Sequence, residues 1–178
     1  MKTVKPFTRI MLLFIFCICS YSCIGPVPVD VVMIDNELFF VLEEEREVTY
    51  LEVSTFIDKN KSGHDKWRHE NLKVMWLLGY DLTTEVKKRK YLKLQQIGYG
   101  QKLEEFQITK GPVELQKNVK YLVRIDMGDK FAREVFIINS DNKVIMPKPM
   151  FERQKDRTYS VMIDKDGNKT LILDPVSK

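Results

Sequence analysis

Hydrophobic and polar residues alternate over long stretches of the chain from Val29 onward. Every second residue is apolar from Leu72 to Tyr80 and again from Val119 to Met127, and a weaker alternation covers Thr49–Thr55. A period of two places such side chains on one face of a pleated strand. Further apolar or β-branched runs occupy Val29–Ile34, Leu38–Leu42, Tyr91–Tyr99, Phe131–Ile138, Val144–Met146, Tyr159–Ile163 and Thr170–Leu173. The pattern predicts a strand at each of these places.

Turn-forming segments separate the runs. They lie at Asp58–Gly63, Lys110–Pro112, Met127–Lys130, Ser140–Lys143 and Asp164–Lys169. Alanine, the best helix former, occurs once, at Ala132, whereas the residues that strands favour are plentiful. Many short strands at this spacing predict an all-β sandwich or barrel. The two short helical candidates are Thr84–Lys90 and Gln101–Phe106.

The first 22 residues have the layout of a secretory signal peptide. A basic start with Lys2, Lys5 and Arg9 leads into the apolar run Ile10–Ile18, and small or polar residues follow. A spanning helix needs about 20 apolar residues, and this run is about half as long. We therefore expect a cleaved signal rather than a permanent membrane anchor.

The three cysteines lie close together at the end of this signal, at Cys17, Cys19 and Cys23. The stretch Ser20–Cys23 resembles the lipobox of bacterial lipoproteins, in which the cysteine is acylated and becomes the first residue. Ser20 stands where such boxes usually carry leucine, and the same residues also suit ordinary signal peptidase. Two alternatives therefore stay open: a free periplasmic or secreted protein, and an uncleaved anchor. The expected organisation is a signal peptide at 1–22, a spacer at 23–29 and one β-sandwich domain at 30–178.

Two segments resemble immunoglobulin-like and fibronectin type III domains. Trp76 is similar to the core tryptophan of an early strand, and Leu115–Ile125 is similar to the segment that enters the penultimate strand. The resemblance implies an immunoglobulin-like antiparallel β-sandwich in which the Tyr121 hydroxyl bonds back to the preceding turn. The hairpin Tyr159–Leu173 would be added to the usual strands. The whole chain is also similar to small exported lipoproteins of Gram-negative bacteria whose role is undefined, which implies a place in the cell envelope.

The charge balance gives no reason to expect a nucleic-acid partner. The chain has 29 basic and 25 acidic side chains, and three of the basic ones lie in the signal. The mature chain is therefore nearly neutral, without the basic footprint that nucleic acids require. The densest basic run, Lys87–Lys90, is typical of a solvated loop or strand edge. Contact with anionic lipid or polysaccharide is the alternative.

No pattern of residues indicates catalysis, and we expect neither enzymatic activity nor a cofactor. The two histidines, His64 and His69, lie near Asp65 and Glu70, but their spacing fits neither one helix face nor one strand face. Asp164–Asn168 shares residue types with a calcium loop, but its glycine comes too early, which favours a hairpin turn. Serine residues stand in no nucleophile motif.

Trp67 is the large aromatic residue of a polar loop that also holds His64, Arg68 and His69. An exposed tryptophan can anchor a partner, or it can cover one end of the core. We therefore expect a non-catalytic binding or assembly module, held to the membrane through a lipid on Cys23, with an envelope protein or polysaccharide as partner. The alternatives are a soluble periplasmic ligand-binding protein and a metal-dependent enzyme subunit that uses His64 and His69.

Overall fold

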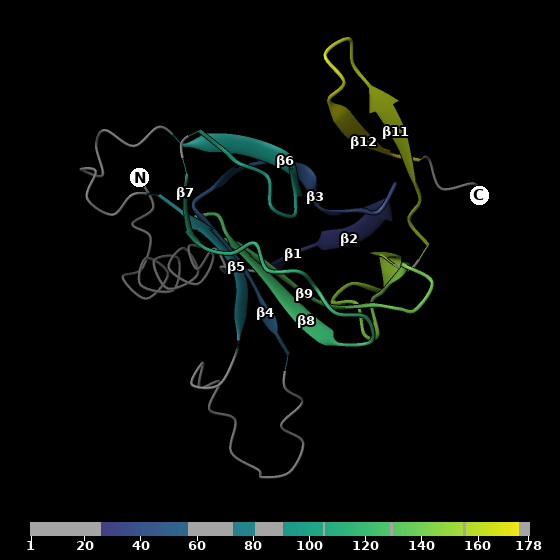
Figure 1. Cartoon of the computed structure of the whole chain (residues 1–178). Coiled ribbons are helices and arrows are strands. Elements are labelled where there is room, and N and C mark those ends of the chain that lie inside the picture. Colours follow the sequence, from purple (N-terminus) through teal and green to yellow (C-terminus); the bar gives the residue numbers. More distant parts are fainter. Residues whose placement is uncertain are drawn as a thin grey trace, which may run out of the picture.

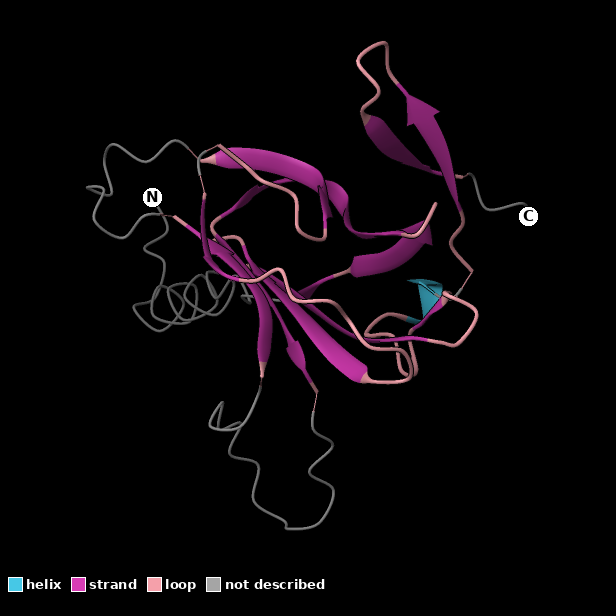
Figure 2. Cartoon of the chain, viewed as in Figure 1, coloured by secondary structure: helices cyan, strands magenta, loops and turns pink. Residues whose placement is uncertain are grey.

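The protein is all-β (Figure 1). The structure, a computed structural model, describes residues 26–56, 73–80, 91–104, 106–128, 130–154 and 156–174. Its strands are β1 (Pro26–Val27), β2 (Val29–Ile34), β3 (Glu37–Val48), β4 (Tyr50–Thr55), β5 (Val74–Gly79), β6 (Leu92–Gly98), β7 (Gln107–Lys110), β8 (Lys120–Asp126), β9 (Phe131–Ile138), β10 (Val144–Ile145), β11 (Tyr159–Ile163) and β12 (Lys169–Leu173). Among these residues the one helical element is the short 3₁₀ turn η2 (Glu152–Gln154), drawn in cyan in Figure 2.

The larger sheet has the strand order β1-β9-β8-β4-β5-β7, and β10 also pairs with β9. Its neighbouring strands are antiparallel, except that β1 runs parallel to β9. In its centre Val53 lies opposite Trp76 on one side and Val123 on the other. The alternation read from the sequence therefore places one row of apolar side chains on the same face of neighbouring strands.

The second sheet has the order β2-β3-β6, and all its pairs are antiparallel. Asp35 and Asn36 join β2 to β3 with positive φ angles of 49° and 64°. Two positive φ angles in a two-residue loop match the twist of the flanking strands, and Asp and Asn tolerate this conformation. A register shift between Val41 and Arg46 then separates two stretches of β3 that pair with β6.

One hydrophobic core joins the two sheets. Phe40 from β3 and Phe136 from β9 are both fully buried, with ring centroids 6.0 Å apart in an edge-to-face arrangement. Tyr121 from β8 packs on Phe136 at 5.6 Å, and Trp76 from β5 is also fully buried. The inward rows of both sheets thus share one core, as they do when two sheets stack face to face.

The hydrogen bond expected from Tyr121 is present. Its hydroxyl accepts a hydrogen bond of 2.7 Å from the backbone N–H of Gln116, in the turn that precedes β8. The ring itself is 1% exposed. A buried tyrosine therefore ties the turn to the start of the strand, as the resemblance implied.

Most predicted strands are confirmed within a few residues, and β7 is the main addition. The candidate helix Gln101–Phe106 is wrong, because no helix forms there among the described residues. Phe106 is instead buried and stacks on Tyr80 at 4.6 Å, which brings the next residues alongside β5 as β7. The predicted break follows at Gly111, where a Cβ atom would lie 2.1 Å from the carbonyl oxygen of Met75. The candidate helix Thr84–Lys90 lies outside the described residues.

The last residues of the expected spacer, from Pro26 on, belong to the two sheets. Pro26 and Val27 form β1 and pair with Phe131 and Ala132 of β9. Val29, the first residue of β2, is 1% exposed. The strands that the structure describes therefore begin at Pro26.

Candidate binding site on the C-terminal hairpin

The site residues predicted from the sequence cannot be compared with the structure. Cys23, His64, Trp67, Arg68 and His69 all lie outside the described residues, as does Lys87–Lys90. Within the described ranges no group of His, Cys, Asp and Glu side chains is placed to hold a metal ion. The same part of the chain contains no helix that is both long and apolar enough to span a membrane.

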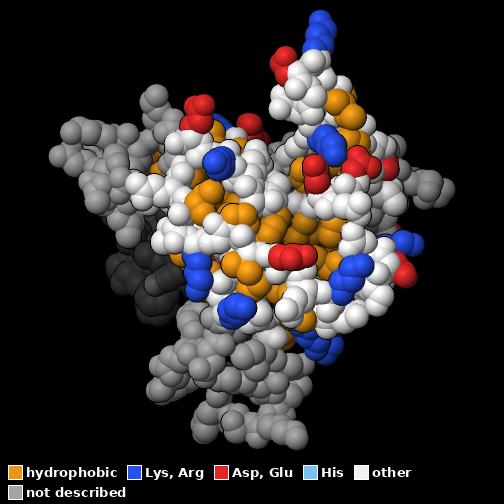
Figure 3. Space-filling view, in the orientation of Figure 1, with side chains coloured by type: hydrophobic (Ala, Val, Ile, Leu, Met, Phe, Trp, Pro, Cys, Tyr) orange, Lys and Arg blue, Asp and Glu red, His pale blue; other side chains and the backbone are white. Residues whose placement is uncertain are grey.

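The feature that stands out is the hairpin of β11 and β12, which projects from the two sheets (Figure 1). In the part of the chain that the structure describes, eight large hydrophobic side chains are exposed, and five of them belong to this hairpin. These are Val161, Met162, Ile163, Ile172 and Leu173, with exposed fractions from 37% to 61%. Figure 3 shows apolar side chains along the stem of the hairpin. Such a concentration of exposed apolar surface is typical of an interaction site.

The turn of the hairpin is built by Asp164. Its Oδ1 atom accepts hydrogen bonds of 2.8 Å from the backbone N–H groups of Asp166 and Asn168, and its Oδ2 atom accepts one from the Asn168 side chain. These hydrogen bonds, first of all that from the Asn168 side chain, lower the pKa of Asp164. The carboxylate therefore organises the turn itself, and the predicted hairpin turn is confirmed.

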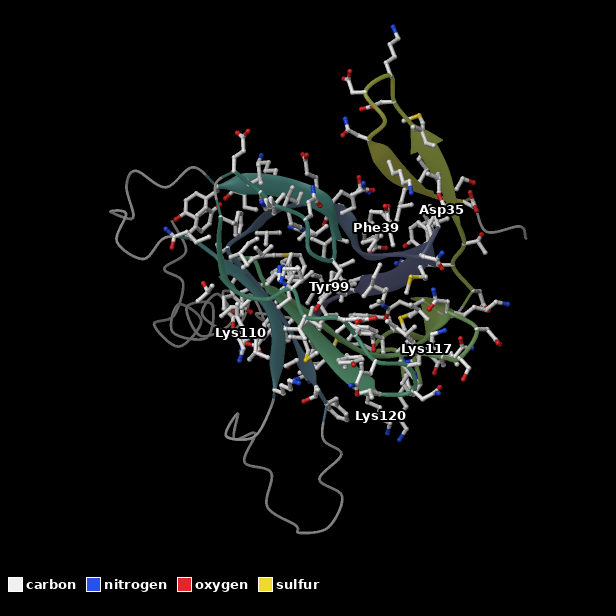
Figure 4. All side chains as sticks on the ribbon, viewed as in Figure 1. Asp35, Phe39, Tyr99, Lys110, Lys117 and Lys120 are labelled. Atoms are coloured by element: carbon white, nitrogen blue, oxygen red, sulfur yellow. The ribbon has the colours of Figure 1, made fainter. Side chains whose placement is uncertain are left out.

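One face of the hairpin packs on the outer face of the smaller sheet. Leu171 is 4% exposed and forms a small apolar cluster with Phe39 and Val41 of β3. Lys169 forms ion pairs with Asp35 and Glu37, at 3.2 and 3.0 Å. Figure 4 shows Phe39 and Asp35 at the foot of the hairpin. The smaller sheet is therefore covered on both faces, which explains why every residue of Val29–Ile34 except Asp30 is apolar.

Gln96 of β6 fastens the edge of β12. Its Oε1 atom accepts a hydrogen bond of 2.7 Å from the Leu171 N–H, and its Nε2 atom donates to the carbonyl of Lys169. The side-chain amide thus satisfies one donor and one acceptor that a neighbouring strand would otherwise pair. The outer edge of β12 is closed at this point by a side chain.

A buried polar cluster holds the segment that leads into the hairpin. Asp30 of β2 is 2% exposed and accepts hydrogen bonds from Gln154, Arg157 and the Tyr159 hydroxyl. The bonds from Gln154 and Arg157 measure 2.9 and 2.8 Å. Burial raises the pKa of Tyr159 first of all, and the hydrogen bond to Asp30 raises it further. Tyr159, the first residue of β11, is therefore fixed to the body of the protein at its polar end.

Sequence reasoning missed this cluster, although one signal was present. Asp30 is an acidic residue within a run that is otherwise apolar on both faces. An ionisable group in a strand with two buried faces must find partners. The partners are not visible in the sequence because they lie more than 120 residues away along the chain.

Glu134 of β9 forms a second buried acidic position. It is 3% exposed, and its two carboxylate oxygens accept hydrogen bonds of 2.9 Å from the backbone N–H groups of Val135 and Met150. Burial raises the pKa of this carboxyl above its ordinary value, against the opposing effect of these hydrogen bonds. Glu134 therefore holds the segment after β10 against the strand.

The outer edge of β11 carries the backbone groups that are available to a partner. The backbone N–H of Asp174 donates to the carbonyl of Thr158, and that of Asp164 donates to the carbonyl of Asn168. The backbone N–H and C=O groups of the even-numbered residues of β11 therefore point toward β12. Because the direction alternates along an antiparallel strand, the N–H and C=O groups of Tyr159, Val161 and Ile163 point the other way. Among the described residues no strand pairs with this edge. It contains neither a charged residue nor a proline, the usual means of protecting an edge.

Comparisons with known proteins found nothing similar. No family model, no curated protein and no solved structure matches the chain. The site must therefore be interpreted from its own chemistry.

Proposed function

We propose that this protein is an exported, lipid-anchored module of the cell envelope that binds an extended segment of a partner by strand addition to β11. The observation that carries the proposal is the uncharged outer edge of β11, with which no described strand pairs, beside exposed apolar side chains. An extended peptide added at such an edge gains main-chain hydrogen bonds, and neighbouring side chains supply specificity. The role is binding or assembly, without catalysis.

The exposed side chains fit this way of binding. Tyr159, Val161 and Ile163 lie on one face of β11, and Ser160 and Met162 lie on the other. A strand added beside β11 places its own side chains in contact with Val161 and Ile163 on one face and with Met162 on the other. Alternating apolar residues in the partner would therefore bury surface that the hairpin leaves exposed.

The anchoring of the hairpin supports a role that depends on a fixed geometry. A two-stranded hairpin alone is at best marginally stable in water. Here Leu171, Gln96 and the Asp30 cluster hold it to the smaller sheet. The edge is therefore already ordered before a partner binds. Binding then does not lose the conformational free energy of ordering it, which raises the affinity.

We also propose that the two stacked sheets form an immunoglobulin-like sandwich, as the resemblance implied. Strand β3 pairs with β6, β4 with β8, and β8 with β9. In such domains strand B likewise pairs with E, C with F, and F with G. The strand β7 is a departure, because it follows β6 in the chain but pairs with β5 in the other sheet. The proposal makes the hairpin β11–β12 an addition to that framework.

Site-specific photo-crosslinking tests the binding proposal. A photoreactive residue at position 163, in cells that express the full chain, is expected to give a discrete adduct with an envelope component. The change Val161→Pro removes an N–H from the outer edge without removing a bond to β12, so it should abolish this adduct. The same photoreactive residue at Lys93, an exposed residue of β6, serves as the position control.

The matched control variant is Thr170→Pro, which removes a bond within the hairpin because Thr170 lies opposite Met162. It should lower the stability of the hairpin, whereas Val161→Pro should leave the thermal unfolding midpoint nearly unchanged. An adduct at position 163 that persists in Val161→Pro, or equal adducts at positions 163 and 93, would contradict strand addition.

A further inference from the structure

Three residues form a symmetric row along the outer edge of β11. The backbone groups of Tyr159, Val161 and Ile163 point away from β12, and Val161 lies in the middle of the row. In an antiparallel pair, residues that lie directly opposite each other can exchange both backbone hydrogen bonds. A two-fold axis at Val161 therefore brings the three outward N–H groups of one β11 strand to the three outward carbonyl groups of an identical strand.

We propose that β11 pairs with β11 of a second copy of this chain, antiparallel and centred on Val161, so that two hairpins form one four-stranded sheet. The inference rests on the proposed function, because it names the partner that adds a strand to this edge. The contact is isologous, the same surface from both copies, so it closes at two copies. Gln96 occupies the outer edge of β12, which ends the sheet on each side.

The side chains of β11 also match under this two-fold operation. Tyr159 lies opposite Ile163 of the second copy, and aromatic and β-branched residues form favourable pairs across strands. Val161 lies opposite its own equivalent, and on the other face Ser160 lies opposite Met162. The side chains of Val161, Met162 and Ile163 are between 37% and 61% exposed, so pairing removes apolar surface from water.

Charge does not oppose the pairing of two copies. Charged residues on an edge strand commonly prevent self-association, because like charges would then lie opposite each other. Strand β11 has no charged residue. The next residue, Asp164, lies opposite Thr158 in this register, and its carboxylate is already hydrogen-bonded within the turn. Apart from the expected signal the chain is also nearly neutral, so two copies do not repel each other strongly.

Other registers of the same pairing are poorer. A shift by one residue brings the outward groups of one strand to residues whose groups point toward β12. A shift by two residues in one direction moves Ile163 opposite Arg157, which precedes the strand and is buried in its ion pair with Asp30. The shift in the other direction moves Tyr159 opposite Lys165, which lies in the turn. The register centred on Val161 is the one that pairs all three outward residues.

The interface is small, which indicates where the pairing occurs. The strand contributes five residues from each copy, whereas a standard interface has roughly 20–30 residues a side. Strand pairing alone is therefore weak between copies that diffuse freely. Two copies held on one membrane meet at a higher effective concentration, and the proposed lipid anchor supplies this condition.

Single cysteines test the pairing and its register in cells that express the full chain. Residues 24–178 contain no cysteine, so each variant adds one thiol to this part. Val161→Cys places two thiols at the two-fold axis, with Cα atoms about 5.5 Å apart, within the range for a disulfide. In the matched control Ser160→Cys the two equivalent Cα atoms lie about 7–8 Å apart, beyond that range. After mild oxidation we expect at least about tenfold more disulfide-linked dimer in Val161→Cys than in Ser160→Cys, measured by non-reducing electrophoresis and intact mass.

A second change tests the backbone pairing itself. Ile163→Pro, added to Val161→Cys, removes the N–H that donates to Tyr159 of the second copy and removes no bond to β12. It should reduce the dimer at least about tenfold, with a nearly unchanged thermal unfolding midpoint. Equal dimer formation in Val161→Cys and Ser160→Cys, or a dimer that persists in the folded Ile163→Pro variant, would overturn the inference.

The photo-crosslinking experiment at position 163 separates this inference from the proposed function. An adduct that contains two copies of the chain supports both. An adduct with a different envelope component, without a Val161→Cys dimer, overturns pairing between copies and leaves strand addition standing. The absence of both the adduct and the dimer overturns both.

Discussion

Asp30 and Arg157 form an ion pair in which both side chains are buried, with exposed fractions of 2% and 7%. Arg157 also forms an ion pair with Glu43 at 3.1 Å, so removing Asp30 takes away one of its two carboxylates and costs less than the ~3–5 kcal/mol of a buried charge left without any partner. We therefore expect Asp30→Asn to lower the free energy of unfolding by about 2 kcal/mol, measured by urea denaturation. Lys169→Gln, which breaks exposed ion pairs, should cost less than about 1 kcal/mol. Equal losses in the two variants would contradict the assigned role of Asp30.

Glu134 should make the stability of the protein depend on pH. Its pKa is raised in the folded state because the carboxyl is buried, so the folded protein keeps this proton to a higher pH than the unfolded chain does. Stability should therefore fall as the pH rises from the ordinary value of 4.5 through the raised pKa. Glu134→Gln should lose this part of the pH dependence, measured as unfolding free energy between pH 4 and about 8. An unchanged profile would show that Glu134 does not titrate as described.

The strands show how far the sequence determines the elements. Strands β2, β8 and β9 were predicted almost to the residue, because period-two alternation and β-branched runs report burial on a sheet directly. Strand β7 was missed because it is four residues long and mostly exposed, and its position depends on the contact between Phe106 and Tyr80. A contact between distant residues leaves no local pattern.

The candidate site was less predictable than the fold. The apolar runs and the polar segment between them predict the hairpin Tyr159–Leu173 and its turn, with the apolar residues in strands. Whether such residues are buried or exposed depends on what covers them. Leu171 is covered by Phe39 and Val41, which lie more than 110 residues earlier in the chain. Likewise the buried polar cluster combines Asp30 with Gln154 and Arg157, which no single stretch of sequence brings together.

Replacing Gln96 should loosen the attachment of the hairpin to the smaller sheet. Its amide accepts the Leu171 N–H and donates to the Lys169 carbonyl, so Gln96→Ala should free the edge of β12. We expect the amide of Leu171 to exchange with solvent at least tenfold faster in this variant, measured by hydrogen exchange, because the local opening of the hairpin becomes easier. The amide of Val123 in the central sheet should change much less. Equal acceleration at both amides would indicate a global loss of stability instead.

The proposed function depends on three parts of the molecule. A signal peptide at residues 1–22 would deliver the chain, and a lipid on Cys23 would anchor it. Two stacked sheets would provide a rigid body, and the hairpin would present an open edge. The strands that the structure describes begin at Pro26, three residues after the expected lipid attachment. The body would therefore lie close to the membrane that anchors it, with little chain between them.

The anchor is also the part on which the proposed place of action depends. Intact-mass analysis and membrane fractionation of the native protein, beside a Cys23→Ala variant, test it most directly. We expect a membrane-bound species that starts at residue 23 and carries added acyl mass, and we expect the Cys23→Ala variant to lose both the membrane attachment and the added mass. A soluble species without added mass, unchanged by the substitution, would contradict the lipid anchor.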